Sequence, residues 1–172
     1  MPLPPPRRPG HYRVTLVCLG NICRSPMAHV VLEQRLADAG LHGRVSVSSS
    51  GTGDWHVGEP MDDRAAATLD QAGYDPTRHR ARQYDETEAA SYDLVLAMDS
   101  ANLADVGGRS ERVRLYRDFD PVEPGADVPD PWYGGSDGFD TVLELVERTS
   151  EALVTELSGL SGLSGQSERS AP

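Results

Sequence analysis

Short apolar runs alternate with amphipathic stretches along most of the chain. The apolar runs are rich in β-branched residues, as buried strands usually are, and they lie at residues 12–19, 45–50, 93–97 and 113–115. The stretches with apolar residues at helical spacing lie at residues 25–39, 62–72, 100–106 and 140–157. Strands that alternate with helices in this way predict an α/β fold, in which a parallel sheet is sandwiched between two layers of helices.

The first predicted helix carries clear start and stop signals. Ser25 is followed by Pro26, and a proline at the first helical position loses no hydrogen bond, because an N–H would have no partner there. Serine is a favoured N-cap residue, so Ser25 is predicted to cap this helix. Gly40 is predicted to end it, because glycine readily adopts the left-handed conformation that closes a helix.

The two ends of the chain differ in composition from the region between them. Four of the first six residues are proline, so residues 1–10 are predicted to form a disordered, polyproline-like lead outside the sheet. Residues 158–172 are rich in glycine and serine, which is typical of a flexible linker, and are predicted to be disordered as well. The predicted domain therefore spans residues 11–157.

The chain is strongly acidic. Its 172 residues include 27 aspartates and glutamates against 16 basic residues, all of them arginine, and the formal net charge is −11. Such a surface disfavours nucleic acid and anionic membranes as partners. No apolar run is long enough to cross a membrane, and the first ten residues lack the apolar core of a secretory signal, so we expect a cytoplasmic protein.

The cysteines and histidines do not form a metal-binding pattern. The two cysteines lie five residues apart, and the five histidines are scattered along the sequence. Neither arrangement matches the ligand spacing of zinc sites. The sequence therefore predicts that the protein binds no metal ion and needs no cofactor.

The segment after the first predicted strand carries the clearest chemical signal. It reads Cys18-Leu19-Gly20-Asn21-Ile22-Cys23-Arg24-Ser25. Ligands of parallel α/β sheets bind at the carboxyl ends of the strands, which is where this segment lies. Gly20 and Asn21 can adopt unusual backbone angles, so a tight loop can direct its amide N–H groups inward, and the helix N-terminus adds its positive dipole. Such a loop can hold a phosphate, and Arg24 can bind two phosphate oxygens at once.

Cys18 is predicted to be a nucleophile. The loop amides, the helix dipole and Arg24 all favour the thiolate over the thiol at this position. The Ser25 hydroxyl can also donate to the thiolate, and this role competes with its role as a helix cap. The alternative is that Cys18 is a buried structural cysteine and that Arg24 only caps the helix.

This loop and four later stretches resemble the low-molecular-weight protein tyrosine phosphatase family. The family's signature is matched by residues 17–26, and the later stretches occur in the family's order at residues 51–60, 79–82, 96–99 and 130–133. The resemblance covers the whole predicted domain. It implies a four-stranded parallel sheet with helices on both faces, and a phosphomonoesterase that needs no metal.

The resemblance also implies roles for individual residues. Cys18 would be the nucleophile, Arg24 would bind the phosphate through the transition state, and Asp130 would be the general acid. The phosphate-binding loop would also contain Leu19, Gly20, Asn21, Ile22, Cys23 and Ser25. The walls of the substrate cleft would be Trp55, Trp132 and Tyr133, and a supporting hydrogen-bond shell would contain His79 and Asp99.

Several carboxylates between residues 118 and 140 compete for the role of general acid. The departing tyrosine oxygen gains negative charge during phosphoryl transfer to sulfur, so a protonated acid within hydrogen-bond distance is needed. Asp130 is favoured because prolines precede and follow it and two aromatic residues come next. Asp120, which lies between Phe119 and Pro121, is the best alternative.

Four residues keep other interpretations. Cys23 could form a reversible disulfide with Cys18, or it could be a small hydrophobic residue packed beneath the loop. Trp55 and Trp132 could stack on a phosphotyrosine ring or belong to the packed interior. His29, on the first helix, is interpreted as a surface residue.

Three functions remain to be compared. The favoured one is a monomeric protein-tyrosine phosphatase that acts on tyrosine-phosphorylated proteins through a cysteinyl-phosphate intermediate. A thiol-dependent arsenate reductase can share the fold and the anion loop, but it needs resolving cysteines, and no cysteine follows Cys23. A phosphotyrosine-binding module without activity is disfavoured because Cys18, Arg24 and Asp130 are all present.

Overall fold

The computed structural model describes residues 2–135, 137–161 and 163. Its strands are β1 (Tyr12–Cys18), β2 (Val45–Gly51), β3 (Leu94–Ala97) and β4 (Val113–Leu115). Its α-helices are α1 (Arg24–Asp38), α2 (Asp63–Gln71), α3 (Ser100–Asp105) and α4 (Asp137–Ser158). Three short 3-10 helices that the sequence did not predict are η1 (Glu86–Ser91), η2 (Tyr116–Phe119) and η3 (Pro131–Tyr133). Each predicted strand and α-helix is present, with its ends shifted by a few residues at most.

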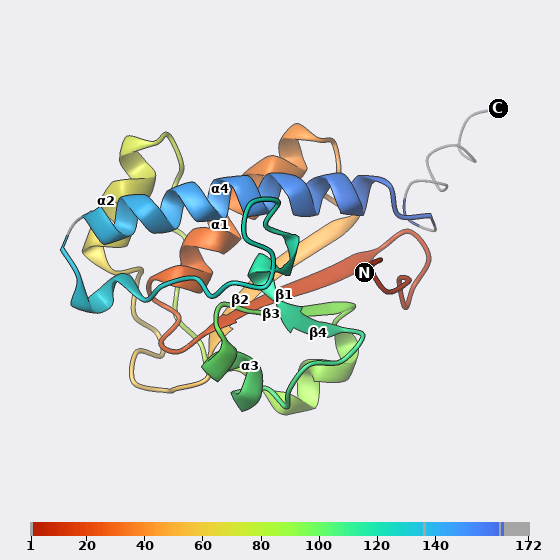
Figure 1. The fold of residues 1–172 in the computed structure, drawn as a ribbon, viewed down its shortest axis with the longest axis horizontal. Coiled ribbons are helices and arrows are strands. Elements are labelled where there is room, and N and C mark those ends of the chain that lie inside the picture. Colours follow the sequence, from red (N-terminus) through yellow and green to blue (C-terminus); the bar gives the residue numbers. More distant parts are fainter. Residues whose placement is uncertain (1, 136, 162, 164–172) are drawn as a thin grey trace.

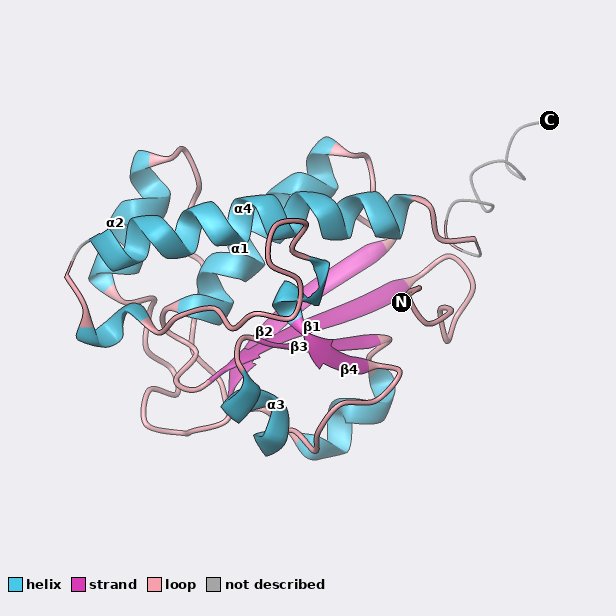
Figure 2. Ribbon diagram, in the orientation of Figure 1, coloured by secondary structure: helices cyan, strands magenta, loops and turns pink. Residues whose placement is uncertain are grey.

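The sheet brings the carboxyl ends of its central strands together. All four strands are parallel and lie in the order β2-β1-β3-β4 (Figure 2). At the end of β1, Cys18 pairs with Gly51 of β2, and Val17 pairs with Ala97 of β3. The loop that leaves β1 therefore lies between the ends of both neighbouring strands, where ligands of such sheets bind.

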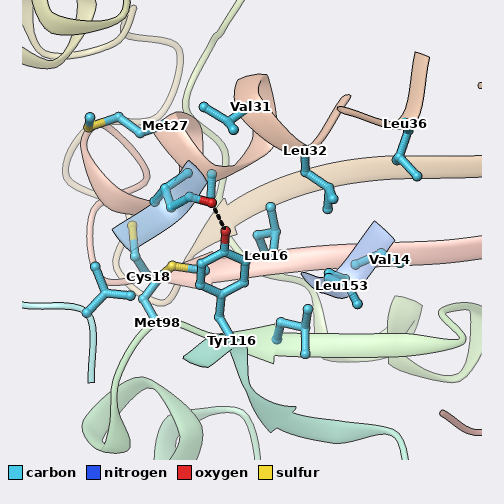
Figure 3. Packing of buried hydrophobic residues seen from close by; sticks show 14 of the residues in the cluster. Val14, Leu16, Cys18, Met27, Val31, Leu32, Leu36, Met98, Tyr116 and Leu153 are labelled. Atoms are coloured by element: carbon cyan, nitrogen blue, oxygen red, sulfur yellow. Dashed lines mark hydrogen bonds between the residues drawn. The ribbon is translucent and has the colours of Figure 1, made fainter. Parts of the chain in front are cut away.

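Helices cover both faces of the sheet. α1, α2 and α4 lie on one face, and α3 lies with η1 on the other (Figure 1). The larger part of the hydrophobic core lies under the first layer, where Leu16 of β1 packs in one cluster with Leu32 and Leu36 of α1 and Leu153 of α4 (Figure 3). The predicted three-layer α/β sandwich with a four-stranded parallel sheet is confirmed.

The start of α1 differs from the prediction, whereas its end agrees with it. The helix begins at Arg24, and the residue in the N-cap position is Cys23, whose side chain makes no capping hydrogen bond. Ser25 therefore lies inside the first turn and is not the cap. Gly40 has a φ of 74°, and the Leu41 N–H donates to the Leu36 carbonyl at 2.8 Å, which closes the helix as predicted.

The proline-rich lead packs on the domain, in contrast to the expectation of disorder for residues 1–10. Leu3 is buried in the main core cluster, and the Tyr12 hydroxyl donates to the Pro4 carbonyl at 3.0 Å. Arg114 donates to the Pro2 carbonyl at 2.8 Å, and the Arg7 N–H donates to Asp93 at 2.7 Å. Prolines cannot donate to a sheet, but their carbonyls still accept hydrogen bonds, and the domain supplies arginine and tyrosine donors.

The predicted C-terminal tail falls largely outside the described residues, because only residues 158–161 and 163 of it are described. Leu163 is buried against the main core cluster, so this part of the tail contacts the domain. Within the described ranges, none of the helices combines the length and apolarity that crossing a membrane requires.

Candidate active site

Two hydrogen-bond donors converge on the sulfur of Cys18. The backbone N–H of Asn21 donates to Cys18 Sγ at 3.3 Å, and the Ser25 hydroxyl oxygen lies 3.0 Å from the same sulfur. Both contacts lie within residues 18–25, a segment that we call the Cys18 loop. Cys18 is buried at the base of this loop. Donors that converge on one sulfur stabilise its anionic form, which is the state that a nucleophile needs.

Asn21 fixes the shape of the Cys18 loop. Its φ of 58° is left-handed, and no other described non-glycine residue has a positive φ. The side-chain NH2 donates to the hydroxyls of Ser25 at 2.8 Å and Ser49 at 3.1 Å. The side-chain oxygen accepts the Arg82 N–H at 3.0 Å, and the Asn21 carbonyl is 2.6 Å from Nε2 of His79. Four partners therefore hold a residue whose backbone conformation would otherwise be unfavourable.

These contacts also determine which way the Ser25 hydroxyl points. The amide nitrogen of Asn21 can only donate, so the Ser25 oxygen is the acceptor of that hydrogen bond. The hydroxyl hydrogen of Ser25 has two acceptors within reach, Cys18 Sγ at 3.0 Å and the Ser50 carbonyl at 3.4 Å, and the sulfur is the nearer of the two. The location of Ser25 agrees with the expected role beside the thiolate.

Gly51, at the end of β2, lets the Cys18 loop lie against the sheet. A Cβ atom at this position would lie 2.7 Å from the Leu19 carbonyl oxygen and 3.0 Å from the Asn21 nitrogen. Both are backbone atoms, which cannot move aside as a flexible side chain can. Gly51 is not among the predicted site residues; its signals in the sequence are its place at the end of a predicted strand and at the start of the family-like stretch 51–60.

Arg24 connects the Cys18 loop to two other segments. It is only 4% exposed, and its NH1 donates to Asp99 at 2.6 Å and to the Val128 carbonyl at 3.1 Å. Its NH2 lies 3.8 Å from Oδ2 of Asp130. Burial by itself lowers the pKa of Arg24, but the nearby Cys18 and both carboxylates outweigh it and raise that pKa overall.

Asp99 holds Arg24 from the end of β3. It is the N-cap of α3, where its Oδ1 accepts the Asn102 N–H at 2.8 Å while its Oδ2 contacts Arg24. The carboxylate thus has a partner on each side, and its orientation is fixed. This is the location that the expected supporting role of Asp99 requires.

Of the two candidate acids, only Asp130 faces the Cys18 loop. Asp130 is the N-cap of η3, its Oδ1 accepts the Trp132 N–H at 3.0 Å, and its side chain is 35% exposed. Asp120 is fully buried elsewhere and forms ion pairs with Arg117 at 2.8 Å and Arg148 at 2.9 Å. Burial alone would raise the pKa of Asp120, but these arginines hold it well below its usual range.

A cleft of about 300 Å³ opens above the Cys18 loop. Its lining consists of Cys18, Leu19, Gly20, Ile22, Cys23, Arg24, Trp55, His56, Asp130 and Trp132. Trp55 is 66% exposed and Trp132 is 42% exposed, so both lie at the mouth and not in the packed interior. The side chain of Tyr133 lies outside what the structure describes. His56, which sequence reasoning missed, lies with its ring centre 6.2 Å from that of Trp132.

Arg64 is another residue of the site that was not predicted from the sequence. It lies in the first turn of α2, with its guanidinium 5.1 Å from the centre of the Trp132 ring, and it donates to the Trp132 carbonyl at 3.4 Å. Asp62 binds the same guanidinium through two hydrogen bonds. Arg64 therefore connects α2 to the segment that carries Asp130, across nearly seventy residues of sequence, and only the tertiary fold reveals this contact.

Cys23 is a buried residue of the Cys18 loop, and it also lines the cleft above the loop. It belongs to the main hydrophobic cluster, and burial raises the pKa of its thiol to about 12, with Asp62 and Cys18 adding to the effect. Cys23 is therefore a neutral thiol at physiological pH. Both cysteines are free, and a reversible disulfide between them, one of the two alternatives left open for Cys23, stays untested.

The fold is an α/β fold with a parallel sheet. One of its two central strands, β1, is followed by a loop of the anion-binding type, and a buried cysteine lies at the base of this loop. A family model described as "Low molecular weight phosphotyrosine protein phosphatase" matches residues 13–160. The chain belongs to this family, and the resemblance inferred from its motifs is confirmed.

Proteins of known name agree with this assignment. A low molecular weight protein-tyrosine-phosphatase of Streptomyces coelicolor is 46% identical over 151 residues, which cover 83% of this chain and 92% of that protein. The crystal structure of YfkJ from Bacillus subtilis is 31% identical, with a TM-score of 0.80, and covers 86% of this chain and 95% of its own. The structure of the YwlE arginine phosphatase is 26% identical, with a TM-score of 0.78, and the match covers 88% of this chain and 99% of that one.

Proposed function

We propose that the protein is a protein-tyrosine phosphatase that hydrolyses phosphotyrosine and small aryl phosphates. The observation that carries this proposal is that three groups suited to phosphoryl transfer line the same cleft. Cys18, with two donors at its sulfur, shares this cleft with Arg24 and with Asp130, whose carboxylate is 3.8 Å from the guanidinium. A nucleophile, an anion clamp and an acid are the three groups that phosphoryl transfer to sulfur requires.

In the first step, the Cys18 thiolate attacks phosphorus, and the bond between phosphorus and the tyrosine oxygen breaks. Arg24, the loop amides and the N-terminus of α1 stabilise the negative charge on the equatorial phosphate oxygens. Asp130 donates its proton to the departing phenolic oxygen, so the leaving group is a neutral tyrosine. The products of this step are a cysteinyl phosphate and an Asp130 carboxylate.

In the second step, water attacks the phosphorus of the cysteinyl phosphate. The Asp130 carboxylate takes a proton from this water, and the phosphorus–sulfur bond breaks. Phosphate leaves, and the Cys18 thiolate returns to the hydrogen bonds of Ser25 and Asn21. One aspartate thus serves as acid and then as base, and the enzyme returns to its starting state.

The walls of the cleft support an aryl phosphate as substrate. Leu19, Trp55 and Trp132 are exposed apolar side chains that line the cleft, and an aromatic ring can stack on them. A phosphoserine side chain is too short to bring its phosphate to the base of the cleft while its peptide contacts these walls. We therefore propose tyrosine-phosphorylated proteins as the natural substrates.

We also propose that the protein acts in the cytoplasm, as a monomer. Cys18 and Cys23 are both free, as expected for a protein in a reducing compartment. A reactive thiol that must stay reduced is compatible with such a compartment and would be oxidised readily outside it.

Two alternative activities need to be tested beside phosphotyrosine hydrolysis. One is that of the arginine phosphatase among the structural neighbours, and the other is arsenate reduction. A phosphoarginine peptide distinguishes an aryl from a guanidinium leaving group, and arsenate with an external thiol tests the reductase. The described chain offers no cysteine beyond Cys23 that could resolve an oxidised Cys18, so no observation favours the reductase.

The test is a set of parallel assays in EDTA with phosphotyrosine, phosphoserine and phosphoarginine versions of one peptide. We expect hydrolysis of the phosphotyrosine peptide, much slower reaction of the other two, and no loss with the chelator, because the described residues hold no cluster suited to a metal. Cys18→Ser is expected to abolish the activity while circular dichroism shows an intact fold. Preference for another peptide, or activity in Cys18→Ser, would contradict the proposal.

A further inference from the structure

A continuous chain of hydrogen bonds leads from the Cys18 sulfur to the outer surface of α1. Its members, in order, are Cys18, Ser25, Asn21, Ser49, His29 and Glu33. The last links are the contact between Ser49 Oγ and His29 Nδ1 at 3.2 Å and the contact between His29 Nε2 and Glu33 at 3.4 Å. His29 is therefore more than the surface residue that its sequence context indicated.

The direction of each hydrogen bond in this chain follows from the Asn21 amide. Its oxygen accepts the Arg82 N–H, so its NH2 must face the two serines. Ser49 therefore accepts from Asn21 and keeps its own hydrogen for His29. A neutral His29 that accepts at Nδ1 carries its proton on Nε2, which faces the Glu33 carboxylate. With His29 neutral, every member has a partner of the correct polarity, and the Ser49 hydrogen has Nδ1 as its acceptor.

Charged groups surround His29 on its open side. A cavity of about 490 Å³ lies beside it, and its titratable lining residues are His29, Glu33, Tyr74, Asp75, Arg78 and His79. The hydrogen bond from His29 lowers the pKa of Glu33, so this carboxylate stays ionised. Burial lowers the pKa of His79 and outweighs the hydrogen bond to Asn21, which raises it, so His79 is neutral at physiological pH. His29 and Glu33 are the members of the chain that meet solvent, with side chains 24% and 56% exposed.

We propose that His29 is a positioning residue for the Cys18 loop, and that only its neutral form holds Ser49 and Asn21 in the orientation described above. Protonation turns Nδ1 into a donor. The Ser49 oxygen has two lone pairs and can accept from both nitrogens, but the serine hydrogen then loses its acceptor and must turn elsewhere. The Asn21 amide then loses part of its support, and with it the direction of the Ser25 hydroxyl. The inference rests on the proposed function, because it takes Cys18 as the nucleophile.

The test compares His29→Ala with His29→Asn, using p-nitrophenyl phosphate at a series of pH values from about 5 to 8. Asparagine places an acceptor near the position of Nδ1 but does not titrate, so it is the conservative replacement. We expect His29→Ala to lower kcat about fivefold, as the loss of one hydrogen bond would, with little change in KM. His29→Asn should retain most of kcat, and its kcat should fall less than that of the wild-type protein as the pH is lowered.

The control is His42→Ala, because His42 is an exposed histidine outside the site. It should match the wild-type protein in kcat and pH profile. In a Ser49→Ala background, His29→Ala should have no further effect, since the connection to the loop is already broken. A kcat for His29→Ala equal to that of the control, an unchanged acid-side decline in His29→Asn, or additive effects with Ser49→Ala would each overturn the inference.

A measurement without substrate separates this inference from the proposed function. The rate at which iodoacetamide alkylates Cys18, located by mass spectrometry, reports the thiolate directly. If the wild-type protein hydrolyses no phosphate ester, the proposed function fails. The positioning role then depends on the alkylation rates alone, which should fall in His29→Ala and recover in His29→Asn. Equal alkylation rates in all the proteins would overturn it.

Discussion

The Cys18 loop and the segment that carries Asp130 form opposite sides of one cleft, but they are held in different ways. In the loop, Cys18, Asn21, Arg24 and Ser25 are no more than 4% exposed, and hydrogen bonds from four segments fix them. Across the cleft, Asp130 and the tryptophans of the mouth are one-third to two-thirds exposed. Asp130 is held there by its cap to η3 and by a long contact to Arg24.

This difference separates two tasks. The phosphate and its transition state are the same for every substrate, so the groups that bind them gain from being buried and fixed. The leaving group and the peptide around it vary, so the side that meets them can be open and held more loosely. Substitutions on the buried side are therefore expected to affect chemistry and stability together, and those on the open side to affect one kinetic parameter at a time.

The largest effect on the open side is expected for Asp130→Ala. Loss of general acid catalysis should lower kcat for a phosphotyrosine peptide by about 10²- to 10⁴-fold, with little change in KM. The first step with p-nitrophenyl phosphate should be far less sensitive, because p-nitrophenolate leaves without a proton. Stopped-flow measurement of that step gives the comparison. Equal losses for both substrates would mean that Asp130 does not protonate the leaving group.

Asp120→Asn tests the comparison from outside the cleft. It removes the charge that pairs with Arg117 and Arg148, so we expect a loss of about 3 kcal/mol or more in the free energy of unfolding at neutral pH. The folded-state pKa of Asp120 is lowered, so its contribution is present above the usual carboxyl pKa of about 3.9 and is lost as the pH falls below it.

Urea unfolding at pH 7 and at about pH 3 measures this contribution. The difference in the free energy of unfolding between the wild-type protein and Asp120→Asn should be smaller at about pH 3 than at pH 7. The kcat of the folded variant at neutral pH should equal that of the wild-type protein. A large fall in kcat without a loss of stability would place Asp120 in the chemistry and undo the choice of Asp130.

The smallest effect is expected for Trp55→Ala. This side chain is two-thirds exposed, so its removal should leave the free energy of unfolding nearly unchanged. Loss of an aromatic contact of about 1 kcal/mol should raise KM for a phosphotyrosine peptide roughly fivefold and leave kcat in place. Urea unfolding and steady-state kinetics separate the two quantities. A loss of several kcal/mol in stability would show that Trp55 belongs to the core.

The parts of the molecule that the sequence predicted are those that local pattern determines. β1, the Cys18 loop and α1 are consecutive, and their residue types are enough to indicate a strand, an anion-binding loop and a helix. Asp130 was distinguished from Asp120 by its neighbours in sequence, and the structure adds that Asp120 is buried in ion pairs. The error at Ser25 is also local, because two roles competed for one hydroxyl.

What the sequence did not reveal depends on contacts between distant segments. Ser49 and Gly51 lie about 25 residues after the end of the Cys18 loop, and their importance comes from the pairing of β2 with β1. The His29 side chain reaches the loop through Ser49, and Arg64 contacts Trp132 only in the folded chain. The proline-rich lead was misjudged because its partners, Asp93 and Arg114, lie far along the sequence.

The most direct test of the account is to find the phosphate on Cys18. Asp130→Ala, mixed with p-nitrophenyl phosphate, should release about one equivalent of p-nitrophenolate in a rapid burst, because the first step proceeds while hydrolysis of the intermediate lacks its base. Quenched protein analysed by mass spectrometry should carry one phosphate on the peptide that contains Cys18, and Asp130→Ala combined with Cys18→Ser should carry no phosphocysteine. A burst with phosphate on another residue, or turnover with no phosphoenzyme and no burst, would contradict the account.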